Sequence, residues 1–238
     1  MARGISQKGN LWKGRGWLWK LLFTLFVLLV PAPIVLILIF RFLPIPGTPE
    51  MLVSLAQGKG ASYAWTGDIS PRLERAVIAA EDQNFCTHNG FDWAGINKAM
   101  EEHNRHPKKP MRGASTISQQ AARTLFLVPM RSWIRKGLEA YLTVLIEGLW
   151  PKKRILQAYL NTVDWGDGIF GAEAAASAYF GADAGSLDGT QAARLAAILP
   201  NPHKWKAAHP GRYVRQRTGM LQGRSAMVTR DGLNFCVK

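Results

Sequence analysis

Two glutamates are the residues of this sequence best suited to chemistry, and Glu81 is the first. It follows Leu73 by eight positions and Val77 by four, so a helix would turn its carboxylate toward the apolar side. Burial raises the pKa of a carboxyl group, and a pKa near neutrality suits general acid–base catalysis. The same spacing is compatible with a frayed helix end and a solvated Glu81, so both interpretations stay open.

Glu139 is the second glutamate. It lies four positions after Arg135 and three after Lys136, which places the three side chains on one face of a helix. In most helices such spacing produces a surface ion-pair cluster. Taken alone, it favours a structural role for Glu139.

A cationic segment lies between the two glutamates. From His103 to Leu138 there is no acidic residue, and the basic residues are Arg105, Lys108, Lys109, Arg112, Arg123, Arg131, Arg135 and Lys136. Such a stretch favours a polyanion, a phosphate or an anionic membrane surface. Within it, Gly113 to Gln120 concentrates hydroxyl and amide groups at the expected start of a helix toward Leu127, where backbone amides could hold an anion. An ordinary capped helix beside a solvated basic loop is the alternative.

Helices are expected to position these residues. Ser70 and Pro71 are a typical N-cap and first-turn proline, and the apolar residues Leu73, Ala76, Val77 and Ala80 follow at helical spacing. A second helix is predicted from about Ser132 to Leu149. Its expected apolar stripe is Ile134, Leu138, Tyr141, Leu142 and Leu145.

Three further helices complete the expected domain. One begins at Pro151 and ends near Asn161, an alanine-rich one lies between Gly171 and Gly181, and a third runs from the capping box of Asp188 and Gln191 to Pro200. Glu101 to Arg112 is expected to be a polar loop. Because no run of alternating strands is found, the sequence predicts a mainly α fold.

The N-terminal part predicts a membrane anchor. Leu21 to Phe40 is a 20-residue stretch without a charge, the length that a helix needs to cross the hydrocarbon core. Five basic residues precede it and only Arg41 follows closely, so residues 1–20 are expected in the cytoplasm, 21–43 in the membrane and 44–238 outside. A cleaved signal peptide ending near Pro31 is the alternative, but the apolar run resumes at Ile34 and lacks a cleavage site.

The net charge of +14 is concentrated at the two ends of the chain. Residues 1–43 carry +6, residues 44–202 carry +1 and residues 203–238 carry +7. A nucleic-acid binder more often spreads its basic residues over a folded face, so no nucleic-acid partner is expected. Cys86 and Cys236 have no metal-ligand or redox spacing, which leaves a disulfide and two free thiols as alternatives.

Four segments in order resemble the peptidoglycan glycosyltransferases, the family that also forms one half of bifunctional penicillin-binding proteins. Glu81 to Asp92 resembles the motif EDxxFxxHxGxD, Gly113 to Gln120 resembles GGSTxTQQ, Arg135 to Glu139 resembles RKxxE, and Lys152 to Asn161 resembles KxxILxxYLN. The similarity runs from about Pro71 to Pro202. No transpeptidase motif follows, so the chain resembles the monofunctional members.

The resemblance implies a lysozyme-like helical glycosyltransferase domain that polymerises lipid II into β-1,4-linked glycan strands with inversion. Glu81 is then the general base on the acceptor hydroxyl, and Glu139 is the second catalytic carboxylate, near the departing pyrophosphate. The substrate-binding residues that it implies are Asp82, Phe85, His88, Ser115, Thr116, Gln119, Gln120, Arg123, Arg135, Lys136, Lys152 and Asn161. Arg123 stands where the family usually has lysine. A planar guanidinium group, which can bind phosphate through two hydrogen bonds, thus replaces the compact charge of an ammonium group.

The resemblance also implies partners and a location. The substrates are lipid II and a glycan linked to undecaprenyl pyrophosphate, basic residues or a divalent cation (Mg²⁺ or Mn²⁺) stabilise the leaving group, and cell-wall synthesis proteins are the expected protein partners. The site is expected in the periplasm, on a single-pass protein of the bacterial inner membrane. A lytic glycan-cleaving enzyme and a catalytically silent membrane-anchored scaffold are the rival functions.

Overall fold

The structure is a computed structural model of the 238-residue chain, and it describes residues 11–107, 115–130 and 132–238. The chain divides into two compact units, one ending at Phe42 and one spanning Leu43–Lys238. The boundary expected from the sequence lies after residue 43. Residues 1–10 of the expected cytoplasmic segment lie outside the described residues.

The first unit is helical and apolar. It contains α1 (Leu11–Leu29) and α2 (Pro31–Phe42), which meet where Pro31 and Pro33 remove backbone N–H donors. Gly16–Phe42 is long and apolar enough to cross a membrane, and almost none of its most apolar window is buried within the structure. This exposure distinguishes it from the core helix of a soluble protein. The apolar helix starts earlier than the predicted residue 21.

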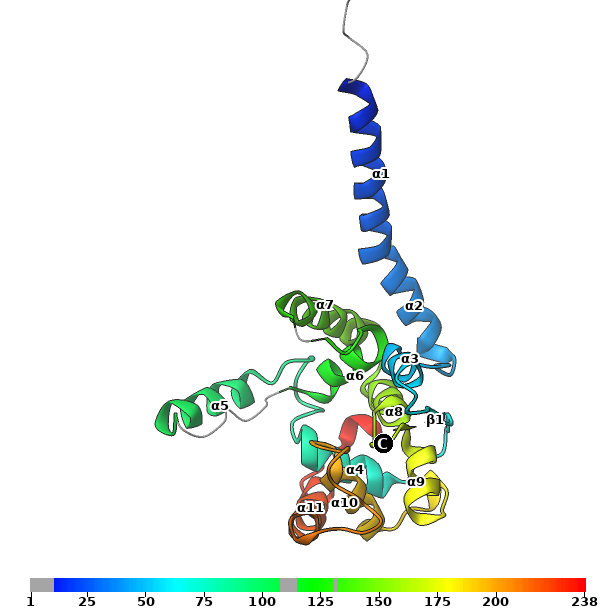
Figure 1. Cartoon of the computed structure of the whole chain (residues 1–238). Coiled ribbons are helices and arrows are strands. Elements are labelled where there is room, and N and C mark those ends of the chain that lie inside the picture. The colour runs from blue at the N-terminus through cyan, green and yellow to red at the C-terminus, as the bar shows by residue number, and fades with distance from the viewer. Residues whose placement is uncertain (1–10, 108–114, 131) are drawn as a thin grey trace, which may run out of the picture. The chain divides into compact units, whose positions relative to one another are not determined.

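The second unit is mainly helical, as the sequence predicts (Figure 1). Its α-helices are α3 (Pro49–Ala56), α4 (Pro71–Glu81), α5 (Trp93–Arg105), α6 (Ile117–Phe126), α7 (Trp133–Leu149), α8 (Lys152–Thr162), α9 (Ala172–Phe180), α10 (Gly189–Ile198) and α11 (Arg212–Arg230). Short 3₁₀ helices are η1 (Ala184–Ser186) and η2 (Phe235–Val237). Strands β1 (Ser62–Tyr63) and β2 (Ile169–Phe170) form a small parallel pair that the sequence did not indicate.

The predicted helix ends agree with the structure because they depend on local capping. The Ser70 hydroxyl accepts from the Arg72 N–H at the start of α4, and Asp188 with Gln191 forms a complete capping box at the start of α10. Gly181 ends α9 in the left-handed conformation with φ of 62°. Each of these signals needs only residues within one helical turn.

Two helical groups form the core of the second unit. Helix α4 packs against α10 and α11, and these three helices lie together in Figure 1. Helix α6 packs against α7 and α8. The C-terminal end of α4 and the N-terminal end of α6 are joined by hydrogen bonds, so Glu81 lies where the two groups meet.

Two predictions about these elements are wrong at least in part. Glu101 to Arg105, expected in a polar loop, form the last turns of α5, while residues 108–112 of that loop lie outside the described residues. On α7 the predicted stripe is correct only in part. Leu142 is buried and Leu138, Tyr141 and Leu145 are half-buried, but Ile134 is 79% exposed, and the other buried residues are Glu139, Thr143 and Ile146. Helix α7 is rotated so that a glutamate faces the interior.

Cys86 and Cys236 form a disulfide, which decides between the two alternatives that the sequence left open. Their Cα atoms are 5.5 Å apart, a normal separation for a disulfide. The bond connects the segment after α4 to η2 at the C-terminal end of the chain. It therefore fixes the end of the chain next to the first motif.

Candidate active site

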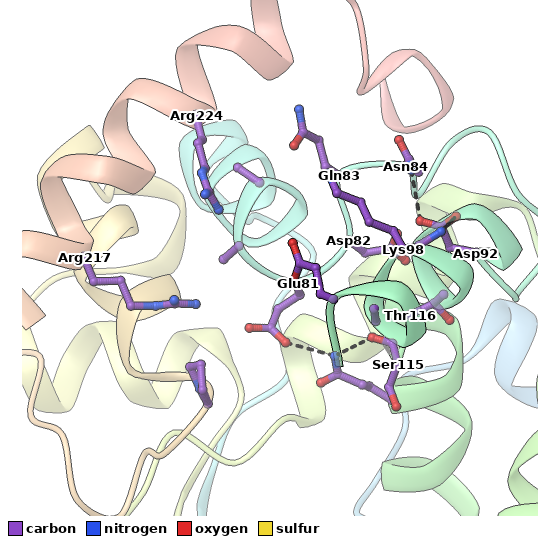
Figure 2. A pocket seen from close by; sticks show the side chains of 17 residues that line it. Glu81, Asp82, Gln83, Asn84, Asp92, Lys98, Ser115, Thr116, Arg217 and Arg224 are labelled. Atoms are coloured by element: carbon purple, nitrogen blue, oxygen red, sulfur yellow. Dashed lines mark hydrogen bonds between the residues drawn. The ribbon is translucent and has the colours of Figure 1, made fainter. Parts of the chain in front are cut away.

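Glu81 lies at a cavity of about 590 Å³, at the last residue of α4 (Figure 2). The cavity is lined mainly by polar groups from the ends of α4 and α6, from α5 and from α11. Its polar and charged lining residues are Glu81, Asp82, Gln83, Asn84, Asp92, Lys98, Glu102, Ser115, Thr116, Gln120, Arg217 and Arg224. Five of these, Glu81, Asp82, Ser115, Thr116 and Gln120, are residues that the sequence assigned to the site.

The carboxylate of Glu81 is held in one orientation by a relay of two hydrogen bonds. Gln120 donates from Nε2 to Glu81 Oε2 at 3.0 Å, and the buried Tyr159 donates its hydroxyl to Gln120 Oε1 at 3.0 Å. Burial raises the pKa of Tyr159 well above its ordinary value, so this hydroxyl keeps its proton. Tyr159 thus fixes the direction of the Gln120 amide, and the amide fixes Glu81.

Burial also raises the pKa of Glu81, while the Gln120 hydrogen bond and the nearby Arg217 lower it. The net shift is upward. A carboxylate in this position binds a proton more readily than a solvated one and still faces an open cavity. Of the two interpretations of Glu81 that the spacing allowed, the structure supports the partly desolvated one.

Asp82 and His88 organise the loop that follows α4. The Gly90 N–H donates to His88 Nδ1 at 3.1 Å, so Nε2 carries the ring proton and donates to Asp82 at 2.9 Å. Asp82 also accepts from the Ile117 N–H at 2.9 Å. His88 therefore acts on the site through Asp82, and Asp82 connects α4 to the start of α6.

The start of α6 is a closed capping arrangement rather than the anion cradle that its residues allow. Thr116 and Gln119 form a capping box, and the Thr116 hydroxyl donates to the Gly90 carbonyl at 2.6 Å. The N–H groups of Thr116, Ile117 and Gln119 all have side-chain acceptors within the protein. The carboxylate bound at this helix start is Asp82, so these amides are not open to a substrate anion.

A second cavity of about 420 Å³ contains two of the predicted basic residues. Arg123 and Arg135 line it with Glu50 of α3, Leu127, Pro129 and Met130. Burial raises the pKa of Glu50, Asp164 raises it further, and Arg123 lowers it. The sequence did not point to Glu50, because it lies outside every motif and precedes Glu81 by 31 positions.

Glu139 is buried and pairs with Arg135, which lines this second cavity. Its side chain is 1% exposed, it pairs with Arg135 at 3.8 Å, and it accepts a hydrogen bond from Lys136 Nζ. The predicted helical ion pairs are confirmed, but the surface location that their spacing suggested is wrong. In this position Glu139 holds the side chains of Arg135 and Lys136 in place.

Lys152 lies in an internal network rather than on either cavity. It donates to Glu147 Oε1 at 2.7 Å, its Nζ lies 4.6 Å from the centre of the Phe85 ring, and Glu147 also accepts from the Ser118 hydroxyl. Phe85 itself is completely buried. Lys152, Phe85 and Glu147 therefore tie α8, α7 and α6 to the first motif.

Asn161 is also fully buried. Its side chain accepts from the Thr66 N–H at 2.9 Å and donates to the Thr66 carbonyl at 3.0 Å, which pairs it with the segment between β1 and α4. This pairing is structural. Phe85, His88, Gln119, Lys152 and Asn161 are thus supporting residues of the site and do not line either of the two cavities described above.

Among the described residues, no group of three or more His, Cys, Asp or Glu side chains is arranged to hold a metal ion. The divalent cation that the family resemblance implies has no such ligand set here, and no step proposed below depends on one. Gly113 and Ala114 of the second motif, and Lys108, Lys109, Arg112 and Arg131 of the cationic segment, lie outside the described residues.

Arg217 and Arg224 of α11 complete the first cavity, and the sequence did not point to them. Their only signal was their spacing of seven, which places two arginines on one face of a helix. Because the C-terminal segment contains many basic residues, this spacing did not single out the two arginines.

Comparison with known proteins connects this site to a family. A family model described as "Transglycosylase" matches residues 50–225. A protein of Caulobacter vibrioides named biosynthetic peptidoglycan transglycosylase is 50% identical over 220 residues, covering 92% of this chain and 95% of its own. Proteins of the same name from Rhodospirillum centenum and Pseudomonas aeruginosa are 49% and 46% identical and cover 83% and 86% of this chain, and 86% and 91% of their own lengths.

Proposed function

The chain belongs to the transglycosylase family and is a peptidoglycan glycosyltransferase of cell-wall synthesis, and from that premise we propose that its substrate is lipid II. The growing strand, attached to undecaprenyl pyrophosphate, is the donor, and an incoming lipid II is the acceptor. The observation that carries the proposal is the oriented carboxylate of Glu81, which is partly desolvated yet open to a cavity large enough for sugar residues.

Glu81 is the general base. The 4-hydroxyl oxygen of the acceptor attacks the anomeric carbon of the donor, the hydroxyl proton passes to Glu81, and the bond between the anomeric carbon and the phosphate oxygen breaks. The electron pair of that bond leaves with undecaprenyl pyrophosphate. Because attack and departure occur on opposite faces of the sugar, the configuration at the anomeric carbon is inverted, and the new bond is β-1,4.

The leaving group needs cations, and the second cavity supplies them. Arg123 and Arg135 line it, and the buried Glu139 forms ion pairs with Arg135 and with the neighbouring Lys136. Preorganised charge of this kind stabilises negative charge that develops in a transition state. In this proposal Glu139 is a positioning residue, because its side chain is almost completely enclosed.

The chain is a membrane-anchored cell-wall enzyme, and the topology we propose is single-pass in the inner membrane. Five basic residues before the apolar helix favour an N-terminus in the cytoplasm. The Cys86–Cys236 disulfide supports a catalytic domain in the periplasm, because disulfides persist in oxidising compartments.

Two variants and a polymerisation assay test the proposal. The full-length protein in detergent is given fluorescent lipid II, and the product is checked for digestion by lysozyme. Glu81→Gln is expected to lower the rate by about a thousandfold, within the usual contribution of a general base. Glu101→Gln is the matched control, because Glu101 is an exposed glutamate of α5 that pairs with Arg105.

Retained activity in Glu81→Gln contradicts the mechanism. Release of small fragments from finished sacculi by the wild type, with no polymer from lipid II, favours the lytic alternative. Absence of both activities favours the scaffold.

A further inference from the structure

Helix α11 presents two arginines to the cavity that holds Glu81. Arg217 and Arg224 are seven residues apart, so they lie on nearly the same face of the helix. Figure 2 shows both side chains extending from α11 toward the cavity, on the side opposite α5. The residues that pack α11 into the core, Val214, Thr218, Leu221 and Val228, lie beside this face.

Both guanidinium groups lack a protein partner. Within the part of the chain that the structure describes, neither forms a hydrogen bond or an ion pair, and the Nε atom of Arg217 is enclosed without an acceptor. Three of the four carboxylates that line the cavity have other partners, since Glu81 binds Gln120, Asp82 binds His88, and Asp92 caps α5; the fourth is Glu102 of α5, which forms no ion pair with either arginine. Arginine side chains directed into a cavity without a carboxylate partner are suited to an anionic ligand.

The two arginines lie at different distances along the cavity from the base. Arg217 is close enough to Glu81 to be one of the main groups that lower the pKa of that carboxyl, and Arg224 is not one of these main groups. Seven residues of helix correspond to about 10 Å along the axis. The cavity therefore has the carboxylate base near Arg217 and a second cation two turns further along α11.

The acceptor of the proposed reaction has the same arrangement of groups. Its reactive hydroxyl is on the outer sugar, and its diphosphate is attached to the far end of the second sugar, one disaccharide away. We propose that Arg224 binds the diphosphate of the incoming lipid II while its outer sugar lies between Glu81 and Arg217. This inference rests on the proposed function and adds a specific acceptor subsite to it.

The diphosphate fits better than the other anions of the acceptor. It is joined rigidly to the disaccharide, so its distance from the reactive hydroxyl is nearly fixed, whereas the carboxylates of the stem peptide are on a flexible branch. A guanidinium group also binds two phosphate oxygens at once.

The test separates acceptor binding from donor binding. Purified glycan strand on its lipid carrier is supplied at saturation as the donor, and lipid II is varied as the acceptor. Arg224→Ala is expected to raise the KM for lipid II by about tenfold, the effect of losing one charge-assisted hydrogen bond, with kcat little changed. When the donor is varied instead, its KM should stay at the wild-type value.

Matched variants and a modified acceptor test whether the KM effect of Arg224→Ala comes from the loss of diphosphate binding. Arg212→Ala removes an exposed arginine of α11 that does not line the cavity and should leave both KM values unchanged, while Arg224→Lys should retain part of the acceptor affinity. The assay is repeated with a lipid II whose stem peptide is replaced by an uncharged amide. The tenfold effect of Arg224→Ala should persist with this acceptor.

Three results would overturn the inference. The first is an acceptor KM in Arg224→Ala that equals the acceptor KM in Arg212→Ala. The second is loss of the Arg224→Ala effect when the acceptor carries the uncharged stem. The third is a rise in the donor KM of Arg224→Ala as large as the rise in its acceptor KM. In each case wild-type polymerisation of lipid II still supports the proposed function. Failure of the wild type to polymerise lipid II would instead contradict the proposed function.

Discussion

At the residue scale, the site depends on side chains that orient the base. Glu81 is held by Gln120, and Gln120 is held by Tyr159, so a hydroxyl on α8 determines the direction of a carboxylate at the end of α4. Asp82, the next residue, also lines the cavity, but its carboxylate binds His88 and the start of α6. Adjacent acidic residues thus have separate tasks because they have different hydrogen-bond partners.

The pH dependence of activity should report the Gln120–Glu81 contact. Glu81 must be ionised to accept a proton, so activity falls as the pH falls through its pKa, which burial raises and the Gln120 hydrogen bond lowers. Replacing Gln120 with leucine removes the lowering contribution. The acidic limb of the pH profile of kcat/KM should therefore move to higher pH.

Tyr159→Phe provides the graded comparison for that profile. It removes only the hydroxyl that orients the Gln120 amide, so it should move the acidic limb in the same direction by a smaller amount. An acidic limb that stays in place in Gln120→Leu would show that this hydrogen bond does not tune the base.

At the element scale, the start of α6 connects the two halves of the site. Thr116 caps this helix and also donates to the Gly90 carbonyl, and Gly90 packs against α7. Gly90 has φ of +92°, and a Cβ there would lie 2.8 Å from the Thr143 side chain. The loop between α4 and α5 therefore passes against α7 only because this residue is glycine.

Loss of the Thr116 hydroxyl should destabilise this connection. Thr116→Ala removes the cap of α6 and the hydrogen bond to Gly90 together, and is expected to lower the free energy of unfolding by about 1–2 kcal/mol. Thr116→Ser keeps the hydroxyl and should stay close to the wild type. Denaturation of the detergent-solubilised protein, followed by circular dichroism, measures both variants, and equal stability of Ala and Ser would exclude a role for the hydroxyl.

At the scale of the whole molecule, the distribution of charge and the disulfide agree with the proposed topology. The basic N-terminal residues precede an apolar helix, and disulfides such as Cys86–Cys236 persist in oxidising compartments. The bond also joins η2 to the segment that follows α4, so the C-terminal end of the chain supports the first motif. Helix α11, which immediately precedes η2, carries Arg217 and Arg224.

Removing the disulfide should lower the stability of the second unit. The double variant Cys86→Ser/Cys236→Ser opens a loop of 150 residues, and the expected loss is about 2–5 kcal/mol of stability. Thermal denaturation with and without a reducing agent measures it. The wild type should approach the stability of the variant only when reduced, and a variant as stable as the oxidised wild type would contradict a structural role for the bond.

The sequence by itself determined the features that depend on neighbouring residues or on one continuous segment. The caps at Ser70 and Asp188 predict helix starts because a side chain reaches N–H groups in its own first turn. The apolar anchor follows from length and composition. The four motifs indicated the family and placed Glu81 in the site.

Only the tertiary structure decided which groups meet. The periodicity of α7 did not show that Glu139 faces inward, because the buried face of a helix is set by its neighbours, here including α6 and α8. The positions of Glu50 and Arg224, and the pairing of Cys86 with Cys236, depend on residues far apart in the sequence. Those contacts arise from the packing of whole helices, which a local pattern of residues does not specify.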